Sequence, residues 1–135
     1  MKKTAVALIL LGLTGSIWAN NIETGVDAQP RNSSCIRNNG CIVATSHWAN
    51  VINRSGALKT IYVTYQICPQ NEDCRKDTYK VVVQPGTWSD GKIMTLMAKY
   101  HYMGDFYLDA TTTITDENRI VLSTMTKRGM VQVHG

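Results

Sequence analysis

Apolar and polar residues alternate along much of this chain, which is the pattern of half-buried β-strands. The alternation is clearest in the segment IYVTYQIC, where Ile61, Val63, Tyr65 and Ile67 share one face. Comparable segments are expected to form further strands over residues 42–52, 78–84, 92–103, 106–114, 119–126 and 130–134. The pattern therefore predicts about seven short strands.

Turn-forming residues separate these segments: NRSG at 53–56, Pro85-Gly86, Gly104-Asp105, TDEN at 115–118 and Lys127-Arg128-Gly129. Proline ends a strand because it lacks the backbone donor, and glycine permits turn dihedrals. Residues 93–103 also contain Met, Leu, Ala and Lys, so a helix is the alternative there. We predict an all-β chain, folded as an antiparallel β-sandwich that is immunoglobulin-like or as a small barrel.

One segment, GDFYLDA at residues 104–110, resembles the tyrosine-containing penultimate strand of immunoglobulin-like domains. The resemblance implies a sandwich of two sheets. The cysteines of this chain depart from the usual inter-sheet pair of those domains.

Residues 1–19, MKKTAVALILLGLTGSIWA, have the layout of a cleavable export signal. Lys2 and Lys3 precede a short apolar run, and Ala19 is a small residue suited to signal peptidase. The run is too short for a stable helix across a bilayer core of about 30 Å. The segment resembles the signal peptides of exported proteins of Gram-negative bacteria. Cleavage after Ala19, or after Ser16 as the alternative, predicts a periplasmic or secreted protein without stable membrane insertion.

Residues 20–40 are polar and show no apolar periodicity, so we expect an extended or mobile N-terminal arm. Residues 41–135 are then expected to form a single β-sandwich domain.

Four cysteines follow the leader: Cys35, Cys41, Cys68 and Cys74. An even number in an exported chain favours two disulfides. Three connectivities are possible. Turn-rich intervals favour the local pairs Cys35–Cys41 and Cys68–Cys74, whereas crossed pairs would close longer loops. The spacing does not suit a zinc site.

Charge and motifs argue against several functions. The net charge is +4, but two of the cations lie in the leader. After the leader no run of Lys or Arg is longer than two residues, so we predict no nucleic-acid partner. Motifs of hydrolases, metalloproteases and nucleotide-binding proteins are absent. We predict no cofactor, no metal and no catalytic residues. A small secreted hydrolase or nuclease using His47 or His101 is the enzymatic alternative.

Aromatic residues give the functional lead, because they exceed what one core can hold and favour recognition sites. The candidate binding residues are Trp88, Tyr100, Tyr102 and Tyr107. Trp88 lies in QPGTWSDGK, expected to be a loop in which the indole either binds a ligand or covers the core. We predict a non-enzymatic exported domain that binds a protein partner in a bacterial envelope, secretion or surface assembly. A carbohydrate-binding module is the alternative.

Overall fold

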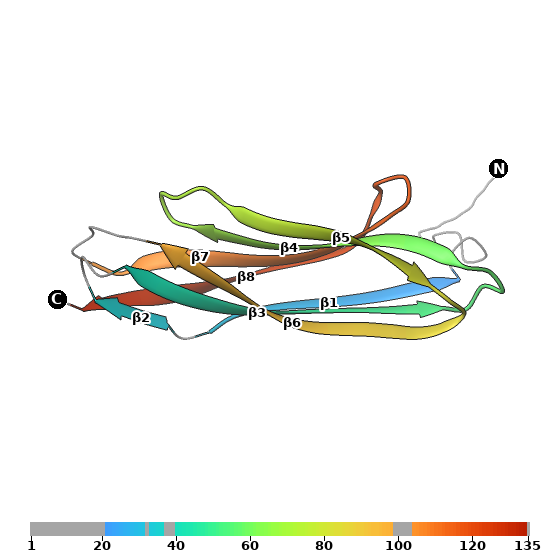
Figure 1. Ribbon diagram of the computed structural model, residues 1–135, viewed down its shortest axis with the longest axis horizontal. Helices are drawn as coiled ribbons and strands as arrows, with labels where there is room; N and C mark the ends of the chain where they lie inside the picture. Colours follow the sequence, from blue (N-terminus) through green and yellow to red (C-terminus); the bar gives the residue numbers. More distant parts are fainter. Residues whose placement is uncertain (1–20, 32, 37–39, 99–103, 135) are drawn as a thin grey trace, which may run out of the picture.

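The computed structural model describes residues 21–31, 33–36, 40–98 and 104–134. Two sheets pack face to face as an elongated β-sandwich (Figure 1). The strands are β1 (Ile22–Pro30), β2 (Ser33–Ile36), β3 (Cys41–Asn53), β4 (Lys59–Pro69), β5 (Arg75–Val83), β6 (Gly86–Ala98), β7 (Phe106–Asp116) and β8 (Val121–His134). The predicted all-β sandwich is confirmed, and no helix in the described ranges is long and apolar enough to span a membrane.

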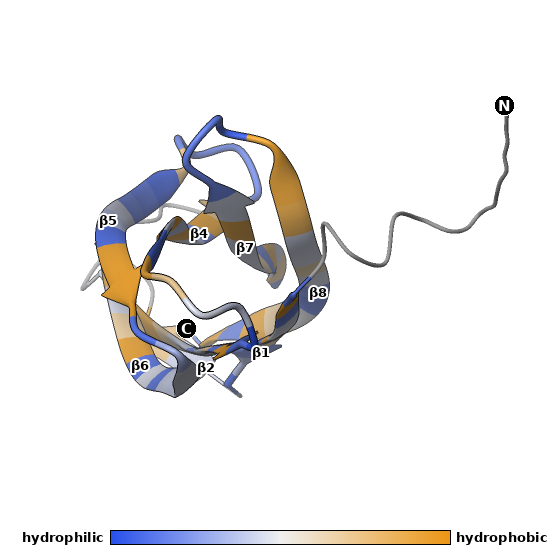
Figure 2. Cartoon of the chain, turned by 90° about the vertical axis from the view of Figure 1, so that its right-hand side faces the viewer, coloured by the Kyte–Doolittle hydropathy of each residue, from blue (hydrophilic) through white to orange (hydrophobic). Residues whose placement is uncertain are grey.

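The first sheet has three antiparallel strands in the order β1-β3-β6. The second has five strands in the order β2-β8-β7-β4-β5, in which β2 runs parallel to β8 and the other neighbours are antiparallel. Viewed along the sandwich, β8 lies beside β1 on one side and β5 beside β6 on the other (Figure 2). The chain passes from β5 to β6 at Pro85-Gly86, where Gly86 has a φ of 128°. This crossing places two edge strands side by side.

The core follows from the alternation of side chains along the strands. Every second residue of β3 is buried from Cys41 to Asn53, and every second residue of β4 from Ile61 to Pro69. The apolar core has two clusters. One gathers around Ile67, Phe106 and Leu108 near the first disulfide, and the other gathers around Val51, Val63 and Tyr65.

The expected N-terminal arm is wrong, because most of this segment is paired backbone. Strand β1 pairs with β3 along its whole length, and β2 pairs with β8. Ala28 is buried in the core, and Ile22 and Val26 pack against it. Thr24 and the polar neighbours interrupt the apolar alternation, so the sequence pattern of this strand is weak. Backbone pairing with a strongly apolar neighbour is sufficient to recruit such a strand.

Two other predicted boundaries are corrected. Trp88 lies within β6, so its segment is a strand rather than a loop. The two strands expected at the C-terminal end are one continuous strand, β8, and Lys127-Arg128-Gly129 pairs with β7 instead of turning. A Cβ placed on Gly129 would lie 2.5 Å from the Cβ of Pro30, so this glycine serves a close approach between β8 and β1. The helical alternative fails over residues 93–98, which belong to β6; residues 99–103 lie outside the described residues.

Both local disulfides are present, which confirms the favoured pairing. Cys35–Cys41 has a Cα–Cα distance of 4.7 Å, and Cys68–Cys74 one of 4.1 Å. The first bridge belongs to the core, whereas Cys74 is exposed in the connection between β4 and β5. This connection and β2 lie at the end of the sandwich that carries the C-terminus (Figure 1).

Candidate functional site

His47 is a buried polar side chain in the middle of β3. Its Nε2 lies 2.7 Å from the Thr45 hydroxyl, and its Nδ1 lies 3.0 Å from the Thr112 hydroxyl. The Thr112 hydroxyl donates its proton to the Asp27 carbonyl at 2.7 Å, so it accepts from His47. The ring therefore carries its proton on Nδ1 and accepts a hydrogen bond from Thr45 at Nε2.

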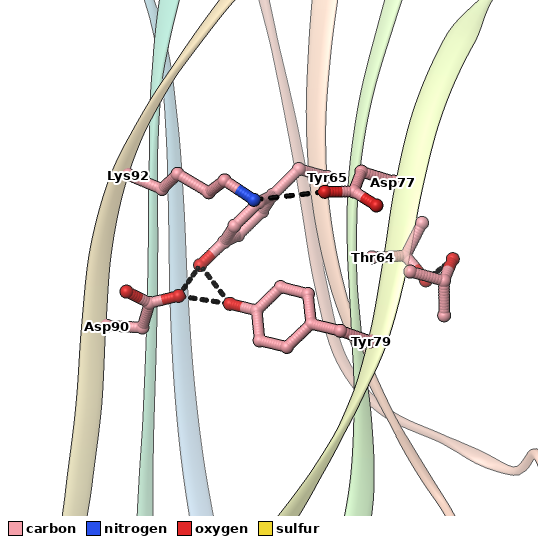
Figure 3. A network of polar contacts seen from close by, with 7 residues as sticks. Thr64, Tyr65, Asp77, Tyr79, Asp90 and Lys92 are labelled. Atoms are coloured by element: carbon pink, nitrogen blue, oxygen red, sulfur yellow. Dashed lines mark hydrogen bonds and ion pairs between the residues drawn. The ribbon is translucent and has the colours of Figure 1, made fainter.

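A network of polar side chains joins β5 to β6 beside this histidine (Figure 3). The Tyr65 hydroxyl donates to the Asp90 carboxylate at 2.9 Å, and the Tyr79 hydroxyl contacts both groups. Lys92 pairs with Asp77 at 2.9 Å, and its ammonium lies 5.5 Å from the centre of the Tyr65 ring. The network connects the two sheets across their adjoining edges.

Burial sets the protonation states of this region. Burial lowers the pKa of His47, and the positive charge of Lys92 lowers it further. Burial also raises the pKa of Tyr65 to about 12, with a contribution from Asp90. The pKa of Tyr79 is raised by burial and by its hydrogen bonds to Asp90 and Tyr65. At neutral pH the imidazole is uncharged and both phenols are hydrogen-bond donors.

A groove lies beyond this network, where β6 faces the connection between β4 and β5. It has a volume of about 790 Å³ and is lined by Pro69, Asn71, Glu72, Asp73, Cys74, Arg75, Leu96 and Met97. The side chains of Glu72, Asp73 and Arg75 have no ion-pair partner among the described residues. Its lining combines apolar side chains, such as Leu96 and Met97, with charged ones.

The outer face of the three-stranded sheet exposes large apolar side chains. Ile42 on β3 is 57% exposed and lies directly opposite Met97 on β6, which is 65% exposed. Ile93, on the same face of β6, is 61% exposed. We call Ile42, Ile93 and Met97 the apolar face. Exposed apolar side chains are ordinary when scattered, whereas neighbours on one sheet face indicate an interaction surface.

Trp48 lies on this outer face and is 42% exposed. Its ring approaches Gly25 on β1, and its register partner on β6 is Gly91. A hollow of about 540 Å³ beside the indole is also lined by Gln29, Arg31 and Ser46. An open aromatic surface flanked by groups that form hydrogen bonds can hold a ligand with both apolar and hydroxyl surfaces.

The predicted binding residues do not form one site in the described structure. Trp88 is half-buried and packs against the core cluster around Val51, which favours the covering role. Tyr107 is exposed on β7, where the Arg128 guanidinium lies 5.1 Å from the centre of its ring. Tyr100 and Tyr102, like His101, lie outside the described residues. Binding by these residues stays a prediction.

Sequence reasoning missed the apolar face, although a signal was present. The pairs Ile42-Val43, Ile93-Met94 and Leu96-Met97 place apolar residues on both faces of a strand. Such pairs break strict alternation, and they mark strands whose second face is covered or available for binding. The groove forms where the connection between β4 and β5, closed by the Cys68–Cys74 disulfide, faces β6. The spacing of residues along the sequence does not reveal this contact.

All four cysteine sulfurs are bonded in pairs, so they are not thiolate ligands here. Among the described residues, no group of three or more His, Cys, Asp or Glu side chains could hold a metal ion.

No protein-family model matches the chain, and no curated protein matches its sequence. Similarity appears in solved structures. A β-glucuronidase from Bacteroides uniformis matches with a TM-score of 0.55 and 11% identity, over 77% of this chain and 12% of that chain. Bacteroides uniformis β-glucuronidase 2 matches with a TM-score of 0.54 and 12% identity, over the same shares.

A CARDB domain from Pyrococcus furiosus covers 84% of this chain and 96% of its own, with 16% identity and a TM-score of 0.46. The chain spans about an eighth of the length of the glucuronidases, whose matches cover 12% of those chains. At such low identity the likeness shows the fold: this chain is a β-sandwich domain.

Proposed function

We propose that this protein is an exported β-sandwich that binds a protein partner through the apolar face of its three-stranded sheet. The observation that carries the proposal is the exposure of Ile42, Ile93 and Met97 on one face of neighbouring strands. Burying apolar side chains of this size contributes about 1.5–3 kcal/mol each, so a partner that covers them gains substantial free energy.

The proposal includes an oxidising location outside the cytoplasm. The two disulfides fit such a compartment. The leader over residues 1–19 supports the same location. A bacterial envelope, secretion or surface assembly is the setting that this combination favours.

We also propose that binding is the activity, without catalysis. Both ring nitrogens of His47 are engaged by threonine hydroxyls, and burial keeps the ring neutral. The neighbouring phenols are protonated donors at neutral pH. These groups support the packing of the sandwich rather than an acid–base pair open to a substrate.

The test is capture of a partner from envelope and culture-medium fractions by the mature, oxidised protein. Proteins captured by the unmodified chain should be lost with Ile93→Glu and with Met97→Glu, because each change places a charge in the buried centre of an interface. Val82→Glu is the matched control, since Val82 is exposed on the five-stranded sheet. Equal capture by all four proteins would contradict the proposal.

A second candidate function is carbohydrate binding at Trp48, favoured by the hollow between the indole and the polar side chains of Gln29, Arg31 and Ser46. Sugar rings stack on aromatic faces and hydrogen-bond to such groups. A glycan array should then give a signal that Trp48→Ala abolishes and Tyr107→Ala retains. Absence of any saccharide signal would contradict this second candidate.

A further inference from the structure

Strands β1 and β6 are the two edges of the three-stranded sheet; β1 lies along β8, whereas β6 has only slight contact with β5. Among the described residues β6 pairs with β3, and its other side faces β5 of the opposite sheet without a ladder. An edge strand presents unpaired backbone N–H and C=O groups that another strand can use. Natural sandwiches cover such edges with other segments or place charged side chains on them. A strand can add only to a part of β6 that has space beside it.

The first half of β6 is covered by side chains. Asp90 is bonded to Tyr65 and Tyr79, and Lys92 pairs with Asp77 of β5 (Figure 3). These contacts connect the two edges up to Lys92. Past Lys92, the neighbouring strand β5 reaches only as far as its first residue, Arg75. The disulfide-closed connection that precedes Arg75 faces Leu96 and Met97 across the groove. Residues 93–97 therefore lie beyond these side-chain contacts, and the groove reaches the edge at Leu96 and Met97.

The groove has a chemical preference. Glu72 and Asp73 line it as exposed carboxylates, and Arg75 is the one cation in its lining. The excess of one negative charge favours a basic side chain in a ligand. On the outer side of the same edge Ile93 offers an apolar contact, and Met97, at the margin of the groove, offers a second. Alternate side chains of an added strand would meet these two surfaces in turn.

We propose that an extended segment of the partner protein, with apolar residues alternating with lysine or arginine, adds as a strand to β6 along residues 93–97. This inference rests on the proposed function, because it names how the partner binds beside the apolar face. Main-chain hydrogen bonds to the edge would provide affinity, and the alternating pockets would provide specificity.

The probe for this inference is a synthetic peptide in which valine and lysine alternate, added to the mature, oxidised protein labelled for NMR. We expect amide shift changes over residues 93–97, and slowed hydrogen exchange at those alternate residues whose amides point away from β3. Two further peptides carry N-methyl groups on alternate residues in the two possible phases. One phase should lose binding, because every second N–H of an added strand points at β6, and the other should retain it.

The groove is tested by reversing its charge. The double variant Glu72→Lys, Asp73→Lys should lower the affinity for the lysine peptide by about tenfold, because two attractions become repulsions. Glu117→Lys is the control for a single charge reversal away from the groove, since Glu117 is an exposed acid in the β7–β8 turn. Thermal unfolding of each variant shows whether the fold is intact.

The inference is overturned if no binding occurs at millimolar peptide, if the shift changes lie away from residues 93–97, or if both N-methylated peptides bind equally. These outcomes leave the proposed function intact as long as Ile93→Glu and Met97→Glu abolish partner capture. Loss of the proposed function is distinct: capture would then be insensitive to both variants.

Discussion

Polar side chains in this core form hydrogen bonds with neighbouring polar groups. His47 uses both ring nitrogens, and the Tyr65 hydroxyl reaches the carboxylate of Asp90. A buried polar group costs free energy when it lacks a partner, so these contacts define which residues can occupy each position. Sequence reasoning listed His47 as a candidate catalytic residue because the sequence does not show that Thr45 and Thr112 contact both ring nitrogens.

His47 should make stability depend on pH. Its pKa in the folded protein lies below the ordinary value of 6.5, because burial disfavours the charged ring. Below pH 6.5 the unfolded chain therefore binds this proton while the folded chain does not. Stability should fall by about 1.4 kcal/mol per pH unit as the pH drops from the ordinary pKa towards the folded one.

The measurement is urea unfolding between about pH 7.5 and 5, for the unmodified protein and for His47→Gln. The variant should be less stable at the upper limit and should show a weaker pH dependence across this window. The other two histidines are present in both proteins, so the difference isolates His47. Identical slopes would contradict the assignment of a neutral buried ring.

At the scale of elements, β1 and β8 approach each other closely at Pro30 and Gly129. Gly129 admits Pro30 because it has no Cβ. Gly129→Ala should destabilise the protein by about 1–3 kcal/mol, since a side chain there must displace a proline ring or the strand itself. Gly91→Ala is the control, because a Cβ at Gly91 has no neighbour within 4 Å.

Denaturant midpoints of the two glycine variants provide the comparison. The control is expected to change stability by no more than about 0.5 kcal/mol. Equal losses would indicate that glycine is needed at both positions for a reason other than the contact with Pro30.

The two disulfides should contribute unequally although each closes the same span of 6 residues. In the chain-entropy model each bridge contributes about 2 kcal/mol. Cys35 and Cys41 are 7% and 1% exposed, whereas Cys74 is exposed and Cys68 is half-buried. Replacing the buried pair by alanine should cost about 1 kcal/mol more, because it also leaves space in the core.

Thiol labelling after mild reduction tests the order, with Cys68 and Cys74 expected to react first. Unfolding of the two double-alanine variants tests the energies. Preferential reduction of Cys35–Cys41 would show that this end of the core opens more readily than its burial indicates.

The sequence predicted the elements whose apolar residues alternate strictly, such as β4 and β7. It failed where tertiary contacts replace local signals. Strand β1 depends on pairing with β3, and β8 continues through Lys127-Arg128-Gly129 because β7 supplies partners for the backbone. Trp88 was misplaced because its glycine neighbours suggested a loop, whereas pairing with β3 makes the segment a strand.

At the scale of the whole molecule, the two sheets adjoin at the edges of β5 and β6, and the proposed partner site depends on how these edges meet. Side chains connect these edges in one half, and the other half opens into the acidic groove. The sequence supplied the candidates for binding in general terms, namely exposed aromatics. The sequence did not predict the apolar face or the groove, because each is formed by segments that are distant in sequence.

The described contacts of the sandwich begin at Asn21, whose carbonyl accepts a hydrogen bond from the Arg54 amide at 2.6 Å. Strand β1 begins one residue later, at Ile22. Cleavage of the leader after Ala19 would therefore leave Asn20 as the first residue and every strand complete, whereas cleavage after Asn21 would remove this contact. We predict that the native protein starts at Asn20, as terminal sequencing and the intact mass would show, with both disulfides formed. Recovery of an uncleaved, membrane-bound chain beginning at Met1 would contradict export as a free domain.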